Sequence, residues 1–116
     1  PEFARYIEGF GAKGLEVYLS EFDVNDKAFP DPVEGRDAAV AALASDFLAS
    51  ALSVPAVKLV VTWQLSDRYS WYRELARKRM IGLGRLPRPL PFDEEFRPKP
   101  LYRAMVGAFE ARRPPK

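Results

Sequence analysis

Two carboxylates, Glu21 and Asp23, end an apolar stretch that has the composition of a β-strand. Because side chains alternate along a strand, five residues are predicted to share one inward face: Leu15, Val17, Leu19, Glu21 and Asp23. Ionised carboxylates beside buried Val and Leu are costly unless they are paired and hydrogen-bonded, so ordinary packing seldom selects this pattern. The pattern therefore predicts a reactive site at the end of the strand.

The residue types that are missing narrow the chemistry of such a site. The chain has 116 residues, enough for one modest core, and contains no cysteine and no histidine. Disulfides, thiol nucleophiles, serine-type triads and metal sites built on cysteine or histidine are therefore excluded within these residues. Carboxylate chemistry remains, and we predict neither a metal nor a cofactor.

The balance of charge favours no polyanionic partner. The chain holds 18 Lys and Arg against 16 Asp and Glu, and both signs are mixed along most of its length. We predict that one basic cluster decorates a solvated loop, with a nucleic-acid module as its alternative: Arg73, Arg77, Lys78, Arg79, Arg85 and Arg88. No apolar run approaches the ~18–20 residues of a membrane span. Neither nucleic acid nor a membrane is a predicted partner.

The order of the predicted elements is typical of an α/β protein. Apolar spacing and turn residues predict helix 1–10, strand 15–23, helix 36–52, strand 57–65, a long loop 66–99 and helix 101–112. The predicted buried stripe of the second helix is Val40, Leu43, Phe47 and Ala51. Two strands joined through a helix run parallel, so both end at the same edge, where α/β proteins place their sites.

A second group of candidate residues follows the second strand. Trp63 is predicted on one face with Val57, Leu59 and Val61, and Trp71 follows in the loop. Aromatic faces stack on the apolar faces of sugar rings, while nearby acids accept hydrogen bonds from sugar hydroxyls. Two tryptophans beside two carboxylates predict a carbohydrate ligand. The alternative is that both indoles are core residues.

Three motifs follow one another along the chain: EVYLSEFDV at 16–24, TWQLSDRYSW at 62–71 and PLPFDEEFRPKPLY at 89–102. Together they resemble the C-terminal part of glycoside hydrolase family ten, endo-β-1,4-xylanases with a (β/α)8 TIM-barrel fold, and the resemblance extends from Phe3 to Arg112. It implies that 15–23 is the seventh barrel strand and 57–65 the eighth.

The resemblance also implies a role for each candidate. Glu21 is then the nucleophile of a retaining hydrolysis of xylan or xylo-oligosaccharides, and Asp23 supports it through a histidine carried by the preceding strand. Trp63 and Trp71 are similar to the tryptophans that wall the sugar site next to the cleaved bond. The segment 98–100, which leads into the last helix, is given a structural role.

The chain departs from the family pattern at several points. Ser20 stands where Thr is usual, Phe22 where Leu is usual, and Gln64 where Gly commonly follows the tryptophan. The general acid/base glutamate of the fourth strand and the histidine partner have no counterpart here. We therefore expect this chain to supply the nucleophile and part of the sugar-binding wall, and to be inactive without the rest of the barrel.

Two parallel strands do not close a barrel, which usually takes about 250 residues. The chain also begins at Pro1 and not at Met, so we expect it to be part of a larger enzyme, with the remaining barrel segments or another copy as its partner. The alternative is a noncatalytic fragment that self-associates or a remnant that only contacts carbohydrate. Because polymeric xylan does not cross membranes, secretion is expected.

Overall fold

The computed structural model describes residues 2–78 and 85–112. Along the chain it contains α1 (Glu2–Gly11), β1 (Val17–Phe22), α2 (Val33–Leu52), β2 (Val57–Thr62), the 3-10 turn η1 (Asp67–Tyr69), α3 (Trp71–Arg77) and α4 (Pro100–Arg112). Within the described ranges, every helix is too short or too polar to cross a membrane.

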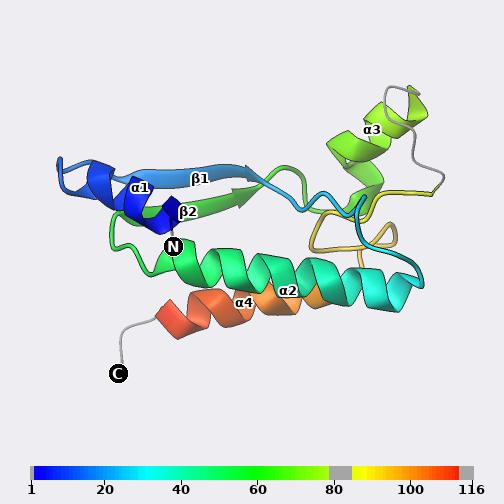
Figure 1. The fold of residues 1–116 in the computed structure, drawn as a ribbon. Coiled ribbons are helices and arrows are strands. Elements are labelled where there is room, and N and C mark those ends of the chain that lie inside the picture. Colours follow the sequence, from blue (N-terminus) through cyan, green and yellow to red (C-terminus); the bar gives the residue numbers. More distant parts are fainter. Residues whose placement is uncertain (1, 79–84, 113–116) are drawn as a thin grey trace.

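The two strands form a parallel pair, as their connection through a helix predicts. Val17 lies opposite Val57, Leu19 opposite Val60, and Phe22 opposite Thr62. Figure 1 shows both strands pointing toward the end of the molecule that carries α3, with α2 running along the pair and α4 beside α2. The carboxyl ends of β1 and β2 therefore meet at one edge.

The core is centred on α2. Its buried stripe is Val40, Ala44, Leu48 and Ala51, which packs against Leu101 and Met105 of α4 in one cluster and against Ile7, Val54 and Val57 in another. The predicted stripe is wrong at Leu43, which is 50% exposed. Most residues of the helix are apolar, so their spacing marks no single stripe, and two of its four buried apolar residues are the small Ala44 and Ala51.

Several predicted boundaries differ from the observed ones. β1 is shorter than 15–23, β2 ends at Thr62 and not at 65, and α2 begins at Val33, ahead of the predicted position 36. The predicted loop 66–99 contains η1 and α3. Serine caps explain this short helix, because Ser70 Oγ accepts a hydrogen bond from the Tyr72 amide at 3.1 Å.

A buried ion pair holds the long segment after β2 in place. Lys99 Nζ donates to Asp67 Oδ2 at 2.8 Å and to the carbonyls of Arg88 and Leu90 at 2.9 and 2.8 Å. Asp67 Oδ1 accepts from the Leu90 amide at 2.9 Å. Loss of water raises the pKa of Asp67 and lowers the pKa of Lys99. The pair is retained because hydrogen bonds replace the lost water on both sides.

Candidate active site

The alternation of faces along β1 breaks at Glu21. The register with β2 is irregular between Leu19 and Phe22, and Glu21 has a φ of 60°, a left-handed conformation that costs a non-glycine residue about 1–3 kcal/mol. Val17 and Leu19 pack against a buried cluster, whereas Glu21 is exposed. The predicted common inward face is therefore wrong at Glu21, because the regular alternation of side chains does not continue through the irregular register.

Asp23 lies just beyond β1 and is half-buried. Loss of water raises its pKa to about 6, and repulsion from the Glu21 carboxylate acts in the same direction. The Glu21 carboxylate therefore acts electrostatically on Asp23. Their environments differ, since one side chain is exposed and the other exchanges a proton near pH 6.

The two tryptophans lie together beyond β2. Trp63 follows the strand and Trp71 begins α3, and both line one hollow of about 390 Å³ together with Gln64 and Tyr69. Trp63 is 45% exposed and Trp71 is 53% exposed, so neither indole is a core residue of this chain. Gln64 has a φ of 79°, so a second strained residue lies at the same edge as Glu21.

The acids and the tryptophans lie on neighbouring strand ends but line separate hollows. The Trp63 amide donates to the Phe22 carbonyl at 3.1 Å, which joins the two strand ends. Glu21 and Asp23 line a hollow of about 610 Å³ that also includes residues 43, 44 and 47 of α2. Neither hollow is lined by both groups, so this chain alone does not combine them into one cavity.

Tyr72 of α3 is a neighbour of Asp23 that the sequence analysis missed. Burial raises the pKa of Tyr72, and the negative charges of Asp23 and Asp26 raise it further. Tyr72 was not predicted because the segment 66–99 was expected to be a loop, whereas it contains α3. The available signal was Ser70, a residue type that commonly caps the first turn of a helix.

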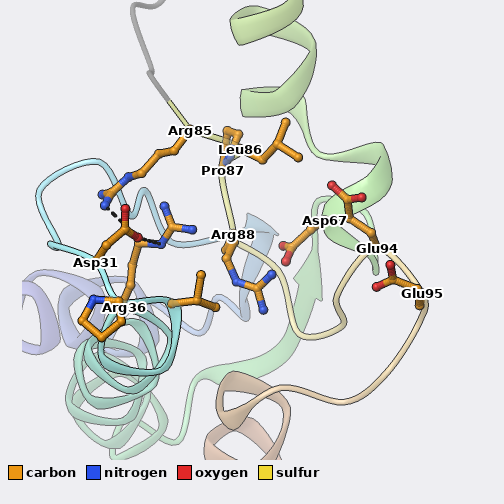
Figure 2. A pocket seen from close by; sticks show the side chains of 11 residues that line it. Asp31, Arg36, Asp67, Arg85, Leu86, Pro87, Arg88, Glu94 and Glu95 are labelled. Atoms are coloured by element: carbon orange, nitrogen blue, oxygen red, sulfur yellow. Dashed lines mark ion pairs between the residues drawn. The ribbon is translucent and has the colours of Figure 1, made fainter.

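A charged pocket of about 600 Å³ lies between the segment after β1 and the long segment after β2. Figure 2 shows Arg36 and Arg85 converging on Asp31, with the Arg88 guanidinium pointing toward the lower part of the pocket. Arg85 Nη1 lies 3.3 Å from Asp31 Oδ1. Arg88 Nε and Nη2 donate to Oδ1 and Oδ2 of Asp37, each at 2.7 Å. These ion pairs join the long segment to Asp31 and to α2. The pocket is lined by none of the predicted site residues, so it is not the candidate active site.

The prediction of a solvated basic loop is wrong for three of its six members, Arg73, Arg85 and Arg88, which are partly buried. Carboxylates or backbone carbonyls bind these three side chains, because the long segment after β2 packs against the rest of the chain. Arg73 binds Glu94 at 2.7 Å, and Arg85 donates to the Asp26 carbonyl at 3.1 Å. Two exposed members, Arg77 and Lys78, pair with Glu74, and Arg79 lies outside the described residues.

Comparison with known proteins identifies similar sequences. The family model described as glycosyl hydrolase family 10 matches residues 1–108. Endo-1,4-beta-xylanase B of Thermotoga neapolitana is 30% identical over 110 residues, which are 93% of this chain and 29% of that protein. A thermostable celloxylanase of Thermoclostridium stercorarium is 32% identical over 117 residues, covering 91% of this chain and 29% of the relative.

Solved structures give the same result. Xylanase 10B from Thermotoga petrophila, in complex with xylobiose, superposes with a TM-score of 0.73 at 28% identity, covering 94% of this chain and 31% of that protein. Native xylanase 10B from Thermotoga maritima gives the same values. The chain thus spans about a third of these structures and has the fold of that part. Since the family model extends over nearly all of its residues, the chain belongs to glycosyl hydrolase family 10.

Proposed function

We propose that this chain is part of a retaining endo-β-1,4-xylanase that cleaves internal bonds of xylan. In this proposal Glu21 is the nucleophile, Asp23 supports it, and Trp63 and Trp71 form part of the wall around the sugar. The observation that carries the proposal is the strained, exposed Glu21 beside Asp23 at the carboxyl end of a parallel strand, in a member of this family.

The proposed reaction has two steps. A Glu21 carboxylate oxygen bonds to the anomeric carbon as the glycosidic C–O bond breaks, and a second carboxyl group protonates the leaving oxygen. Water then attacks the anomeric carbon and breaks the ester bond to Glu21, giving its proton to the second carboxyl group. That second group is about 5–5.5 Å from the nucleophile in retaining enzymes, and we assign it to a part of the barrel outside this chain.

We place β1 and β2 as the seventh and eighth strands of the barrel. The free edges of both strands support only the coarser view that they are neighbouring strands of a larger sheet. The hollow of about 610 Å³ includes one side of β1 and α2, and another of about 410 Å³ includes β2 and α4. Each is a place where a further strand can cover apolar side chains. We therefore propose that the remaining barrel segments are the partners of this chain and that the chain alone is inactive. We also propose that the enzyme is secreted, because it must reach polymeric xylan.

The test is release of reducing sugar from xylan by the full-length polypeptide that carries these residues. Glu21→Ala is expected to lower kcat/KM by about 10³-fold or more, because the covalent step loses its nucleophile. Glu21→Gly is expected to be as inactive while its backbone accepts the left-handed conformation, which separates lost chemistry from lost folding. The exposed acid Glu110 on α4 provides the matched control, Glu110→Ala. A Glu21→Ala variant that keeps most of its activity would refute the assignment.

A further inference from the structure

The segment that follows β1 carries Asp23 and is bound at two neighbouring points to a second segment of the chain. Val24, the residue after Asp23, is buried, and its amide donates to the Pro89 carbonyl at 3.0 Å. Asp26 is also buried, and its Oδ2 accepts a hydrogen bond from the Arg88 amide at 3.0 Å. The Asp26 carboxylate thus takes the place of a main-chain carbonyl as the partner of this amide.

The second segment has its main-chain hydrogen-bonding groups bound from Arg88 to Leu90. Lys99 Nζ donates to the carbonyls of Arg88 and Leu90, and the Leu90 amide donates to Asp67. Pro89 has no amide hydrogen. Pro89 and Leu90 are buried, where an unpaired amide or carbonyl is costly. The second segment is therefore a fixed support for the residues that it binds on the β1 side.

Arg36 of α2 holds the same Asp26 carboxylate from another direction. Arg36 Nε lies 3.4 Å from Asp26 Oδ2, and both side chains are buried. Among residues 2–78 and 85–112, Nε and Nη1 of Arg36 have no hydrogen-bond partner, so attraction to Asp26, and to Asp31 at 3.7 Å, offsets the burial of this cation. The Asp26 carboxylate is thus fixed by an amide and by a guanidinium.

The contacts of Val24 and Asp26 leave only Asn25 between two fixed points, directly after Asp23. Building on the proposed function, we propose that Asp26 is a positioning residue of the reaction, which holds the end of β1 so that Asp23 lies where it supports Glu21. Asp26 acts through the backbone in this proposal and makes no contact with the sugar.

The test compares variants of the full-length polypeptide in the hydrolysis of xylan. Asp26→Ala is expected to lower kcat by about 10- to 100-fold and to change KM by less than about threefold, because displacement of the reacting groups slows the reaction while the tryptophans on the other strand end still bind the sugar. Asp26→Asn keeps an oxygen that can accept from the Arg88 amide, and it is expected to recover most of the lost kcat.

Asp37→Ala is the matched control for lost stability. Asp37 is a buried acid that binds the side chain of Arg88, so this variant breaks an ion pair of the second segment without removing a contact to the segment after β1. It should unfold at a lower urea concentration and keep kcat within about twofold. An unchanged kcat in Asp26→Ala, or equal losses of kcat in Asp26→Ala and Asp37→Ala, overturns the proposal.

Hydrogen exchange measured by mass spectrometry tests the hold of Asp26 without any activity. In Asp26→Ala, the peptide that contains Val24 should exchange about tenfold faster or more, and in Asp37→Ala it should not. Unchanged exchange in Asp26→Ala overturns the proposal. If the exchange is faster and the wild-type polypeptide cleaves no xylan, the proposed function fails, and the role in the reaction fails with it, while the hold of Asp26 on the segment stands.

Discussion

Glu21 and Asp23 stand two positions apart, yet the backbone gives them different environments. Glu21 has a φ of 60° and is exposed, whereas Asp23 is half-buried with a pKa of about 6. A strained residue persists only where surrounding contacts fix it, and such residues gather at functional sites. In the proposed mechanism, the backbone irregularity is thus the feature that separates the exposed Glu21 carboxylate from the half-buried Asp23 carboxyl.

Asp23→Asn is expected to remove a pH dependence of stability. The Asp23 carboxyl has a pKa of about 6 in the folded chain and an ordinary value of 3.8. Between these two pH values, the folded state therefore keeps a proton on Asp23 that the unfolded state has released. The free energy of unfolding therefore falls as pH rises from about 4 to about 6. Allowing for its partial exposure, the loss is about 1–2 kcal/mol.

Urea unfolding of the full-length polypeptide, followed by tryptophan fluorescence at pH 4 and pH 7, measures this loss. The exposed Asp46 of α2 supplies the control Asp46→Asn, which should leave the difference between the two pH values intact. If Asp23→Asn shows the same difference as the wild type, another group is responsible.

At the residue scale, the sequence predicted which side chains gather but not how they point. Residue type and spacing singled out Glu21, Asp23, Trp63 and Trp71, and the structure places each pair together at the carboxyl ends of the strands. The alternation of side chains along β1 fails where the register with β2 shifts, and no residue type in 15–23 indicates that shift. The orientation of Glu21 was therefore not predictable.

One buried cation links the elements that follow β2 to one another. Lys99 joins Asp67 of η1 to the carbonyls of Arg88 and Leu90, so the turn that carries Arg68 and the start of α4 are fixed to each other. Helix α3 itself has no buried residue. The position of the aromatic hollow thus depends on the Asp67–Lys99 pair.

Lys99→Met is expected to cost about 3–5 kcal/mol of stability, because it leaves the Asp67 carboxylate buried without its partner. The double variant Asp67→Asn with Lys99→Met should lose less than Lys99→Met alone, since no unpaired charge remains. Urea unfolding of the full-length polypeptide measures both values. Lys13→Met, at an exposed turn position, should change stability by less than about 0.5 kcal/mol. A Lys99→Met variant as stable as this control would show that the pair is unimportant.

At the element scale, periodicity predicted the long helices and both strands but not η1 or α3. The β-branched run after Val57 and the alanine-rich helix before it carry strong local signals. A seven-residue helix without a buried face carries almost none. The partnership of Asp67 with Lys99 spans 32 residues, and a buried lysine is too rare to be expected from sequence.

The whole molecule is more open than a finished domain. Its radius of gyration is 15.3 Å, against about 13 Å for a compact chain of this length. The described residues form a sheet of only two strands, so each strand has one free edge, and Leu59 and Val61 remain exposed on β2. Surfaces of this kind are usually covered by further strands.

The isolated chain is therefore expected to associate or to precipitate. Size-exclusion chromatography at micromolar concentration should show species larger than 13.1 kDa, and co-expression with the remaining barrel segments should give one soluble complex that releases sugar from xylan. A soluble monomer with a single sharp unfolding transition would contradict this expectation.

The left-handed backbone at position 21 has a consequence for protein engineering. Glycine adopts such a φ freely and asparagine or aspartate tolerates it, whereas β-branched residues resist it. A library that randomises this position will therefore recover folded proteins from a short list of small or amide-bearing substitutes, whatever new chemistry is sought. A redesign of the catalytic step proposed for Glu21 must choose its replacement from that list or reshape the strand first.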